Sequence, residues 1–290
     1  EFLQFVQGNI DYITGLDASY KDDILSADGD LKPNYASTVK MLRAPYLNTE
    51  YFGFYMDSEI SEYQSELIRQ AVNYGFDRSK MMKYLRNGIG IAGIGGFIPK
   101  GLPGHNEGAG YDYQPERAKQ LLETYRSESG NSEPEITLTT TANYLSFSEF
   151  IQRELQSIGL TIRIEVMPPS SLKSAKSNGK IDLFRASWVA DYPDAQNYLS
   201  LFYSGNFAPN GPNYTHFKDT QFDRWYEQAM LETNQEKRIN LYQKMDSLVL
   251  KKAPVVVLFY DEVIRFTSID VNGLGINPTN LLELKNVQKN

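Results

Sequence analysis

The sequence of 290 residues contains no cysteine. This absence excludes disulfides, thiolate nucleophiles and most structural zinc sites. Histidine is scarce as well, since His105 and His216 are the only two and no H-E-x-x-H pattern is present. We therefore expect no metal site and no metal cofactor, and we expect both histidines to be solvated loop residues.

The sequence also lacks an excess of basic residues and a long apolar run. Its 29 Lys and Arg against 36 Asp and Glu give a net charge of -7. Without a basic stripe, no nucleic-acid partner is expected, whereas acidity favours cationic or zwitterionic ligands. No stretch is long enough to span a bilayer. No signal peptide is visible, but the chain starts without Met in an amphipathic turn, so we expect its natural start to lie upstream.

Motifs of common enzyme classes are missing too. There is no G-x-S-x-G nucleophile elbow. The letters G-x-G-x-x-G occur at 88–93, but a predicted helix precedes them and Pro99 follows, which favours a surface or interlobe loop over a phosphate-binding loop. Asp191 and Asp194 are separated by Pro193 and are expected to face different ways, so they do not indicate an acid/base pair. No enzyme activity is predicted.

Strand and helix periodicities alternate along the rest of the chain. Two alternating apolar segments flank a helical stripe that Gly159 ends, which predicts a parallel β-α-β unit with a right-handed crossover. A second unit leads through a helix at 170–178, and an apolar run near the C-terminus is typical of a fully buried strand. The expected strands include 39–43, 51–55, 135–141, 161–167, 181–187 and 254–260.

The predicted fold class is α/β, with no internal repeat. The chain is longer than one compact core usually needs, so we expect one substantial lobe at 57–262. Segments 1–56 and 263–290 would be pieces of a second lobe. The chain would then cross between lobes near Met56 and near Glu262, which is the wiring of a hinge.

The most informative segment runs from Ile181 to Asp194. An apolar strand leads directly into Trp188, Asp191 and Tyr192, and Pro193 fixes the direction of the turn. A rigid acid beside aromatic rings suits a small cation such as the α-ammonium of a peptide. The alternative is a strand end with a buried Trp, followed by a helix that Asp194 caps.

Several motifs, in the right order, resemble those of bacterial extracellular solute-binding protein family 5, the oligopeptide- and dipeptide-binding proteins of ABC importers. The resemblance covers nearly the whole chain. It includes a helix similar to the family's V-R-x-A-x-x-Y-A-x-D-R pattern and a lip similar to its W-x-x-D-Y-x-D pattern. The matching segments are 65–78, 111–122, 156–160, 178–182, 188–194, 218–223 and 253–254.

This resemblance implies a periplasmic-binding-protein type II-like fold, with one complete lobe plus part of the second lobe. The chain would be the C-terminal half of such a protein. Two departures from the family pattern bear on the hinge and on ligand preference: the usual Pro-Phe before the first helix is absent, and Met56 stands where Asn is usual.

The resemblance also implies roles for residues of the lip. Asp191 matches the aspartate that grips the ligand α-amino group, and Trp188 matches a wall of a side-chain pocket. Arg185 is similar to an arginine that meets ligand carboxylates, the alternative being a surface or interlobe ion pair. Tyr260 resembles a tyrosine of the pocket wall, although a tyrosine at a strand end is core by default.

By the same resemblance the protein would be an extracytoplasmic, monomeric substrate-binding component of an ABC importer. Its partners would be a peptide or other small solute and the permease subunits of the transporter, with membrane attachment only through an upstream anchor outside this chain. No cofactor is implied. A nickel complex or an oligosaccharide as ligand, or a ligand-sensing domain of a regulator, remain the alternatives.

Overall fold

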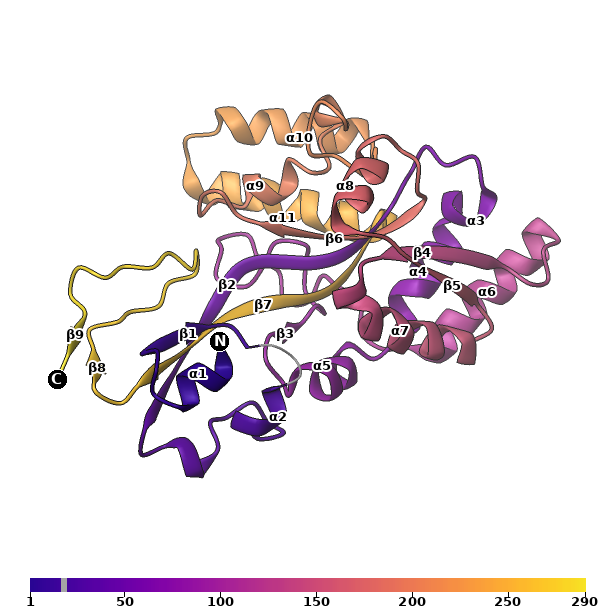
Figure 1. The fold of residues 1–290 in the computed structure, drawn as a ribbon. Coiled ribbons are helices and arrows are strands. Elements are labelled where there is room, and N and C mark those ends of the chain that lie inside the picture. Colours follow the sequence, from indigo (N-terminus) through magenta and orange to yellow (C-terminus); the bar gives the residue numbers. More distant parts are fainter. Residues whose placement is uncertain (17–19) are drawn as a thin grey trace.

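A mixed β-sheet forms the framework of the computed structural model, which describes residues 1–16 and 20–290 (Figure 1). The seven-stranded sheet has the order β1-β7-β2-β6-β4-β5, with β3 beside β7, and β8 and β9 form a separate pair. The strands are β1 (Tyr12–Thr14), β2 (Val39–Phe54), β3 (Ile91–Ala92), β4 (Glu135–Thr140), β5 (Thr161–Val166), β6 (Leu183–Val189), β7 (Val255–Ser268), β8 (Val271–Asn272) and β9 (Gln288–Lys289).

The helices lie mostly between these strands in the chain. They are α1 (Phe2–Val6), α2 (Lys21–Ile24), α3 (Ser61–Gln64), α4 (Glu66–Tyr74), α5 (Arg78–Arg86), α6 (Pro115–Ser129), α7 (Leu145–Ser157), α8 (Pro169–Ser177), α9 (Gln196–Leu199), α10 (Thr220–Leu231) and α11 (Gln235–Lys252), with short 3-10 turns at Pro33–Tyr35, Ala142–Tyr144 and Ser204–Asn206. Within the described ranges, none of these helices combines the length and the apolar character that a membrane crossing needs.

The longest strands are β2, with 16 residues, and β7, with 14, and they pair antiparallel. The prediction of two short strands at 39–43 and 51–55 is wrong, because β2 continues through both. The ladder with β7 is irregular between Pro45 and Thr49. Pro45 has no amide hydrogen to donate, and the amide of Leu47 donates to the carbonyl of Pro278 instead, at 2.9 Å. The segment that resembles a turn in the sequence is therefore an irregularity inside one strand.

The predicted parallel β-α-β unit is confirmed. β4 and β5 pair in parallel from Glu135–Thr161 to Thr140–Val166, and α7 connects them. β4 also pairs in parallel with β6, at Thr139 and Phe184. The C-terminal ends of these three strands therefore meet at one edge of the sheet, called here the carboxyl edge.

Helices cover both faces of this sheet (Figure 1). On one face, α9, α10 and α11 contribute Tyr198, Phe222 and Met245 to an apolar core, called here the large core. On the other face, α4, α6 and α7 contribute to a second core, which includes Ile68 and Leu122. The large part of the molecule is thus a three-layer α/β structure.

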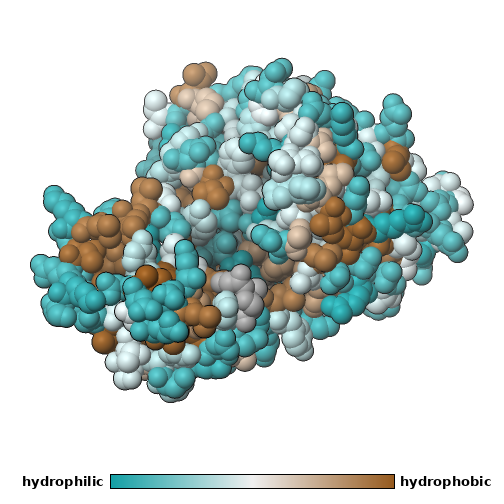
Figure 2. All heavy atoms as spheres, viewed as in Figure 1, coloured by the Kyte–Doolittle hydropathy of each residue, from teal (hydrophilic) through white to brown (hydrophobic). Residues whose placement is uncertain are grey.

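A third apolar cluster is separate from these two cores. It joins the N-terminal segment to the outer ends of β2 and β7, and its buried members are Phe2, Phe5, Ile13, Ile24, Leu25, Val39, Ile89, Ile264 and Phe266. Farther along the same side, Leu281, Leu282 and Leu284 are exposed on the segment between β8 and β9, where Figure 2 shows an apolar surface. Exposed apolar surface of this kind is typical of a face that contacts further protein.

Two buried arginines explain why the α4–α5 motif is needed for the fold. The Arg69 guanidinium donates to the carbonyls of Tyr63, Gln64 and Lys252, at 2.6 to 3.0 Å. The Arg78 guanidinium donates to the carbonyl of Val257 on β7, at 2.6 Å. Because Arg can satisfy several carbonyls at once, each arginine ties the helical segment to main chain of another element.

A buried carboxyl group holds the loop that follows β3. Asp246 on α11 is fully buried, and its Oδ1 accepts from the amide of Phe97 at 2.8 Å. A side chain on Gly96 would collide with the other carboxyl oxygen of Asp246, so glycine is required at that position. Burial raises the pKa of Asp246 to about 7.

Asp246→Asn should remove a pH dependence of stability. The pKa of Asp246 is higher in the folded state than in the unfolded state. Its contribution to the free energy of unfolding is therefore present at acid pH and is lost as the pH rises towards 7. Between pH 4.5 and 8 the wild type should lose on the order of 3 kcal/mol more unfolding free energy than the variant, because one pKa unit is worth about 1.4 kcal/mol. Urea unfolding at both pH values measures this, with Glu236→Gln on the same helix as control. An unchanged pH difference in Asp246→Asn would contradict the assignment.

Candidate ligand-binding site

The carboxyl edge of the sheet is a topological switch point. The chain leaves β4 towards α7, which packs on one face, and leaves β6 towards α9, which packs on the other. In open α/β sheets, adjacent parallel strands whose connections diverge in this way leave a crevice at their carboxyl ends, where ligands bind. The residues that follow β4 and β6 are therefore the first candidates for a site.

The residues of β6 divide between the two faces of the sheet. Phe184 and Ala186 belong to the core under α9 to α11, and Trp188 packs against the same core. Arg185 and Ser187 alternate with them and lie on the opposite face, with Ser187 paired to Glu50 of β2. The strand therefore does not bring Arg185 and Trp188 to one surface.

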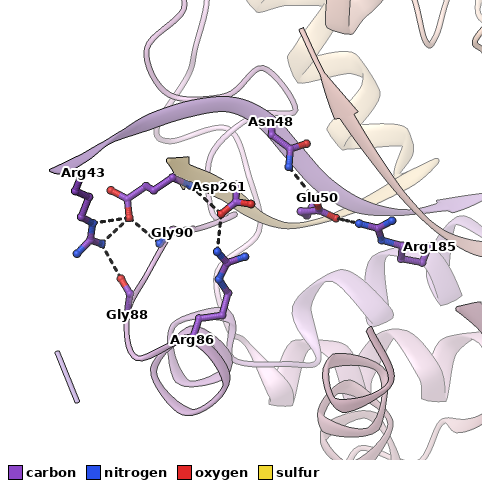
Figure 3. A network of polar contacts seen from close by, with 9 residues as sticks. Arg43, Asn48, Glu50, Arg86, Gly88, Gly90, Arg185 and Asp261 are labelled. Atoms are coloured by element: carbon purple, nitrogen blue, oxygen red, sulfur yellow. Dashed lines mark hydrogen bonds and ion pairs between the residues drawn. The ribbon is translucent and has the colours of Figure 1, made fainter. Parts of the chain in front are cut away.

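Arg185 forms an ion pair with a buried glutamate (Figure 3). Its Nη2 lies 2.6 Å from Oε2 of Glu50, whose side chain is only 3% exposed. The amide of Asn48 donates to the other Glu50 oxygen at 3.0 Å. Burial raises the pKa of Glu50, and the charge of Arg185 and the Asn48 bond counteract this effect. The ring of Tyr144 covers the guanidinium, with 3.5 Å from the ring centroid to Cζ of Arg185.

Two further ion pairs lie where β2 and β7 leave the large core (Figure 3). Arg86 of α5 lies 2.6 Å from Asp261, and Arg43 of β2 lies 2.5 Å from Glu262. Glu262 also accepts from the amide of Gly90 at 2.7 Å. Each of these carboxylates on the long strands thus has an arginine partner, as Glu50 does.

Trp188 and Tyr260 flank the same residue, Thr49 of β2, in the three-strand register. The indole of Trp188 donates to Oδ1 of Asn197 at 2.6 Å and is partly buried. Tyr260 is 2% exposed and its hydroxyl donates to the carbonyl of Gly96. Burial raises the pKa of Tyr260, so this phenol stays neutral. In this structure Tyr260 is a core residue under the loop after β3.

Asp191 lies just beyond the end of β6. The amide of Ala190 donates to the carbonyl of Leu47 at 2.9 Å, which places Asp191 beside the irregular segment of β2. Asp191 is exposed, and among the described residues it forms no ion pair within 4.0 Å. It therefore differs from Glu50, Asp261 and Glu262 in being an unneutralised carboxylate.

The neighbours of Asp191 have local partners. Tyr192 is 45% exposed, and its hydroxyl donates to the side chain of Gln196. Oδ1 of Asp194 accepts from the amide of Gln196 at 2.9 Å, and Oδ2 lies 3.1 Å from Arg238. Asp194 thus accepts a hydrogen bond from the first residue of α9, while Ala195 is the N-cap residue of this helix.

Two cavities lie on either side of the Arg185–Tyr144 pair. The larger, about 310 Å³, lies between the N-terminal cluster and the second core, and its lining includes Ile89, Tyr144 and Phe147. The smaller, about 160 Å³, lies at the carboxyl edge and is lined in part by Arg185 and Lys176. Of these residues, sequence reasoning identified only Arg185. A signal for the missed Glu50 was its place directly before the apolar residues 51–54 of a strand.

The two histidines are not free in solvent, contrary to expectation. Nδ1 of His105 lies 2.7 Å from the carbonyl oxygen of Ile98. His216 lies between the carboxylate of Asp57, at 2.8 Å, and the carbonyl of Ala208, at 3.0 Å. Within residues 1–16 and 20–290, no group of three or more His, Cys, Asp or Glu is arranged to hold a metal ion.

Residues 1–210 match the family model described as bacterial extracellular solute-binding proteins, family 5 Middle. A probable di/tripeptide-binding protein 5 from Pseudomonas aeruginosa is 25% identical over 218 residues, or 73% of this chain and 40% of that protein. The dipeptide-binding protein DppE from Bacillus subtilis is 26% identical over 243 residues, or 79% of this chain and 43% of that protein. The chain thus spans less than half the length of these relatives.

Solved structures share the fold. The periplasmic binding protein DppA from Helicobacter pylori, solved with the peptide STSA, superimposes with a TM-score of 0.80 and 20% identity. The match covers 99% of this chain and 54% of that one. The predicted fold of one complete lobe plus part of a second is therefore confirmed.

Arg185→Met should destabilise the fold by about 3 kcal/mol, because it leaves the buried carboxylate of Glu50 without its counter-charge. The double variant Glu50→Gln/Arg185→Met should recover much of this loss, since it buries no unpaired charge. Chemical unfolding of the wild type and of both variants provides the measurement. A loss below about 1 kcal/mol for Arg185→Met would mean that the ion pair is not structural.

Proposed function

Since the chain belongs to the bacterial extracellular solute-binding proteins of family 5, we propose that it acts in the extracytoplasmic substrate-binding component of an ABC importer and that its ligand is a peptide. Two relatives, the probable di/tripeptide-binding protein 5 and the dipeptide-binding protein DppE, support this choice. The partners would be the permease subunits of the importer, and the protein would bind its ligand without transforming it.

The observation that carries the proposal is the contrast between Asp191 and the other carboxylates of the site. Glu50, Asp261 and Glu262 are each neutralised by an arginine, whereas Asp191 is exposed at the carboxyl edge and has no ion-pair partner among residues 1–16 and 20–290. An unpaired carboxylate on a rigid turn can hold the α-ammonium of a peptide by charge-assisted hydrogen bonds. Trp188, partly exposed nearby in the chain, would cover the adjoining apolar part of the ligand.

Capture would occur by closure of two lobes. We place 57–262 in one lobe, together with the inner end of β2, and the rest of 1–56 with 263–290 in the other. The N-terminal cluster supports this division, because Ile89 is its only buried member from 57–262. The passage between them lies inside β2, because Val39 packs in the N-terminal cluster and Tyr51 packs in the large core. It is therefore earlier in the chain than the crossing expected near Met56. The second passage lies in β7, between Tyr260 and Ile264.

The larger cavity supports a peptide ligand over a small ion. It lies between the two proposed lobes, and Leu85 and Phe147 give it apolar walls beside Arg86. Such a mixture of apolar walls and a few polar groups suits an organic ligand. A peptide could bridge the lobes through main-chain hydrogen bonds, like an added strand, with its side chains in the cavities.

Asp191→Asn should weaken the binding of tripeptides with a free amino terminus by about tenfold to a hundredfold, which is the range of one charge-assisted hydrogen bond. N-acetylated forms of the same peptides should bind the wild type and the variant equally, since they have no ammonium group. Isothermal titration of the full-length protein measures both affinities.

Glu165→Gln is the matched control, because Glu165 is an exposed carboxylate on β5 near the same edge. It should change neither affinity. An equal loss for free and acetylated peptides in Asp191→Asn would argue against the ammonium contact.

A further inference from the structure

The smaller cavity at the carboxyl edge has an unusual concentration of positive charge. Its walls come from the end of β4, from α8, from β6 and from the loop before α10. The polar and aromatic residues that line it are Thr141, Lys173, Lys176, Arg185, Ser187 and Tyr214. Of the residues that the structure describes, no carboxylate lines this cavity, although the chain as a whole has a net charge of -7.

The three cations of this cavity differ in how their charge is balanced. Arg185 is paired with Glu50 at 2.6 Å. Lys173 is exposed to solvent. Lys176 is partly buried, its Nζ lies 4.2 Å from the centroid of the Tyr214 ring, and within the described ranges no carboxylate lies within 4.0 Å of it. Lys176 is thus the cation that lacks both a counter-ion and full hydration.

The surroundings of Lys176 disfavour its charge in the absence of an anion. Burial lowers the pKa of Lys176 to about 8, and the nearby charges of Arg185 and Lys173 act in the same direction. The Nε of Arg185 is also buried without an acceptor. An anion in this cavity would therefore be attracted by two like charges and would relieve their mutual repulsion.

We propose that this cavity binds a carboxylate of the ligand and that Lys176 is its counter-charge. This inference rests on the proposed peptide-binding function and narrows its substrate class to peptides with a carboxylate in reach of the cavity. Ser187 and Thr141 can donate hydroxyl hydrogen bonds to the same group. Arg185 has the different task of neutralising Glu50, so the carboxylate contact that the family resemblance implies for Arg185 passes to Lys176 in this chain.

The two proposed sites have opposite charges, and both lie close to β6. Asp191 follows the end of the strand, and Lys176 lies in the cavity formed with residues 185–187. A peptide offers an ammonium at its amino terminus and a carboxylate either at its C-terminus or on a side chain. Which of these two carboxylates enters the cavity is a question for experiment.

The test measures the affinity of the full-length protein for matched peptides. One set consists of amidated tripeptides of alanine with a single glutamate at position one, two or three, each compared with its glutamine counterpart. The other pair is trialanine and trialanine amide. The wild type should prefer a carboxylate form in at least one comparison by about tenfold or more. The comparison that shows this preference identifies the side chain or the C-terminus as the source.

Lys176→Met should abolish the preference and leave the affinity for the neutral peptides unchanged, because Met keeps the contact with Tyr214. Lys176→Arg should retain the preference, since it keeps the charge. Lys180→Met is the control, because Lys180 is an exposed lysine that follows the end of α8. It should behave as the wild type.

The possible failures are distinguishable. If neutral peptides bind but no carboxylate form is preferred, the cavity is not a carboxylate site and the proposed function stands. A preference that persists in Lys176→Met would show that Lys176 is not the counter-charge. If no peptide of either set binds, the proposed function fails and this inference fails with it.

Discussion

The antiparallel pairing of β2 with β7 is the constraint on which the rest of the structure depends. These strands of 16 and 14 residues run from the N-terminal cluster into the large core. In their inner halves, β2 pairs with β6 and β7 pairs with β3. In its outer half, β7 also pairs with β1 of the N-terminal segment. In the proposed division into lobes, both crossings lie on adjacent, hydrogen-bonded strands, so a motion between the lobes would have to bend these strands together.

Ion pairing distinguishes the charged residues that stabilise β2 and β7 from those that are available to a ligand. Glu50, Asp261 and Glu262 lie on β2 and β7, and each is matched by an arginine from a different element. A carboxylate that is already paired gains little from a ligand ammonium. Asp191 and Lys176, which form no ion pair within the part of the chain that the structure describes, lie at the end of β6 and in the cavity beside it. Their opposite signs fit the two ends of a zwitterionic ligand.

Much of the fold could be predicted because its signals are local. The alternation of apolar residues in β4 and β5 and the stripe of α7 each lie within a short window, and they predict the parallel unit correctly. The continuous strand β2 was missed because Pro45 is a strong local turn signal. Contacts with β6, with β7 and with Pro278, all more than 130 residues later in the chain, keep the segment extended.

The site was less accessible to sequence reasoning because its pairings are long-range. The ion pair of Glu50 with Arg185 joins residues 135 positions apart, so neither residue reveals the other in the sequence. The family resemblance identified Arg69 and Arg78 as part of a motif, but only their burial and carbonyl contacts show that they stabilise the fold. Lys176 resembles an ordinary surface lysine of a helix until the neighbouring strand and loop enclose it.

The most direct test of the central claim is native mass spectrometry of the full-length protein purified from cells without denaturation. The account predicts a retained mass that tandem fragmentation identifies as peptides with free amino termini. A retained metal complex or oligosaccharide in place of peptides would contradict it.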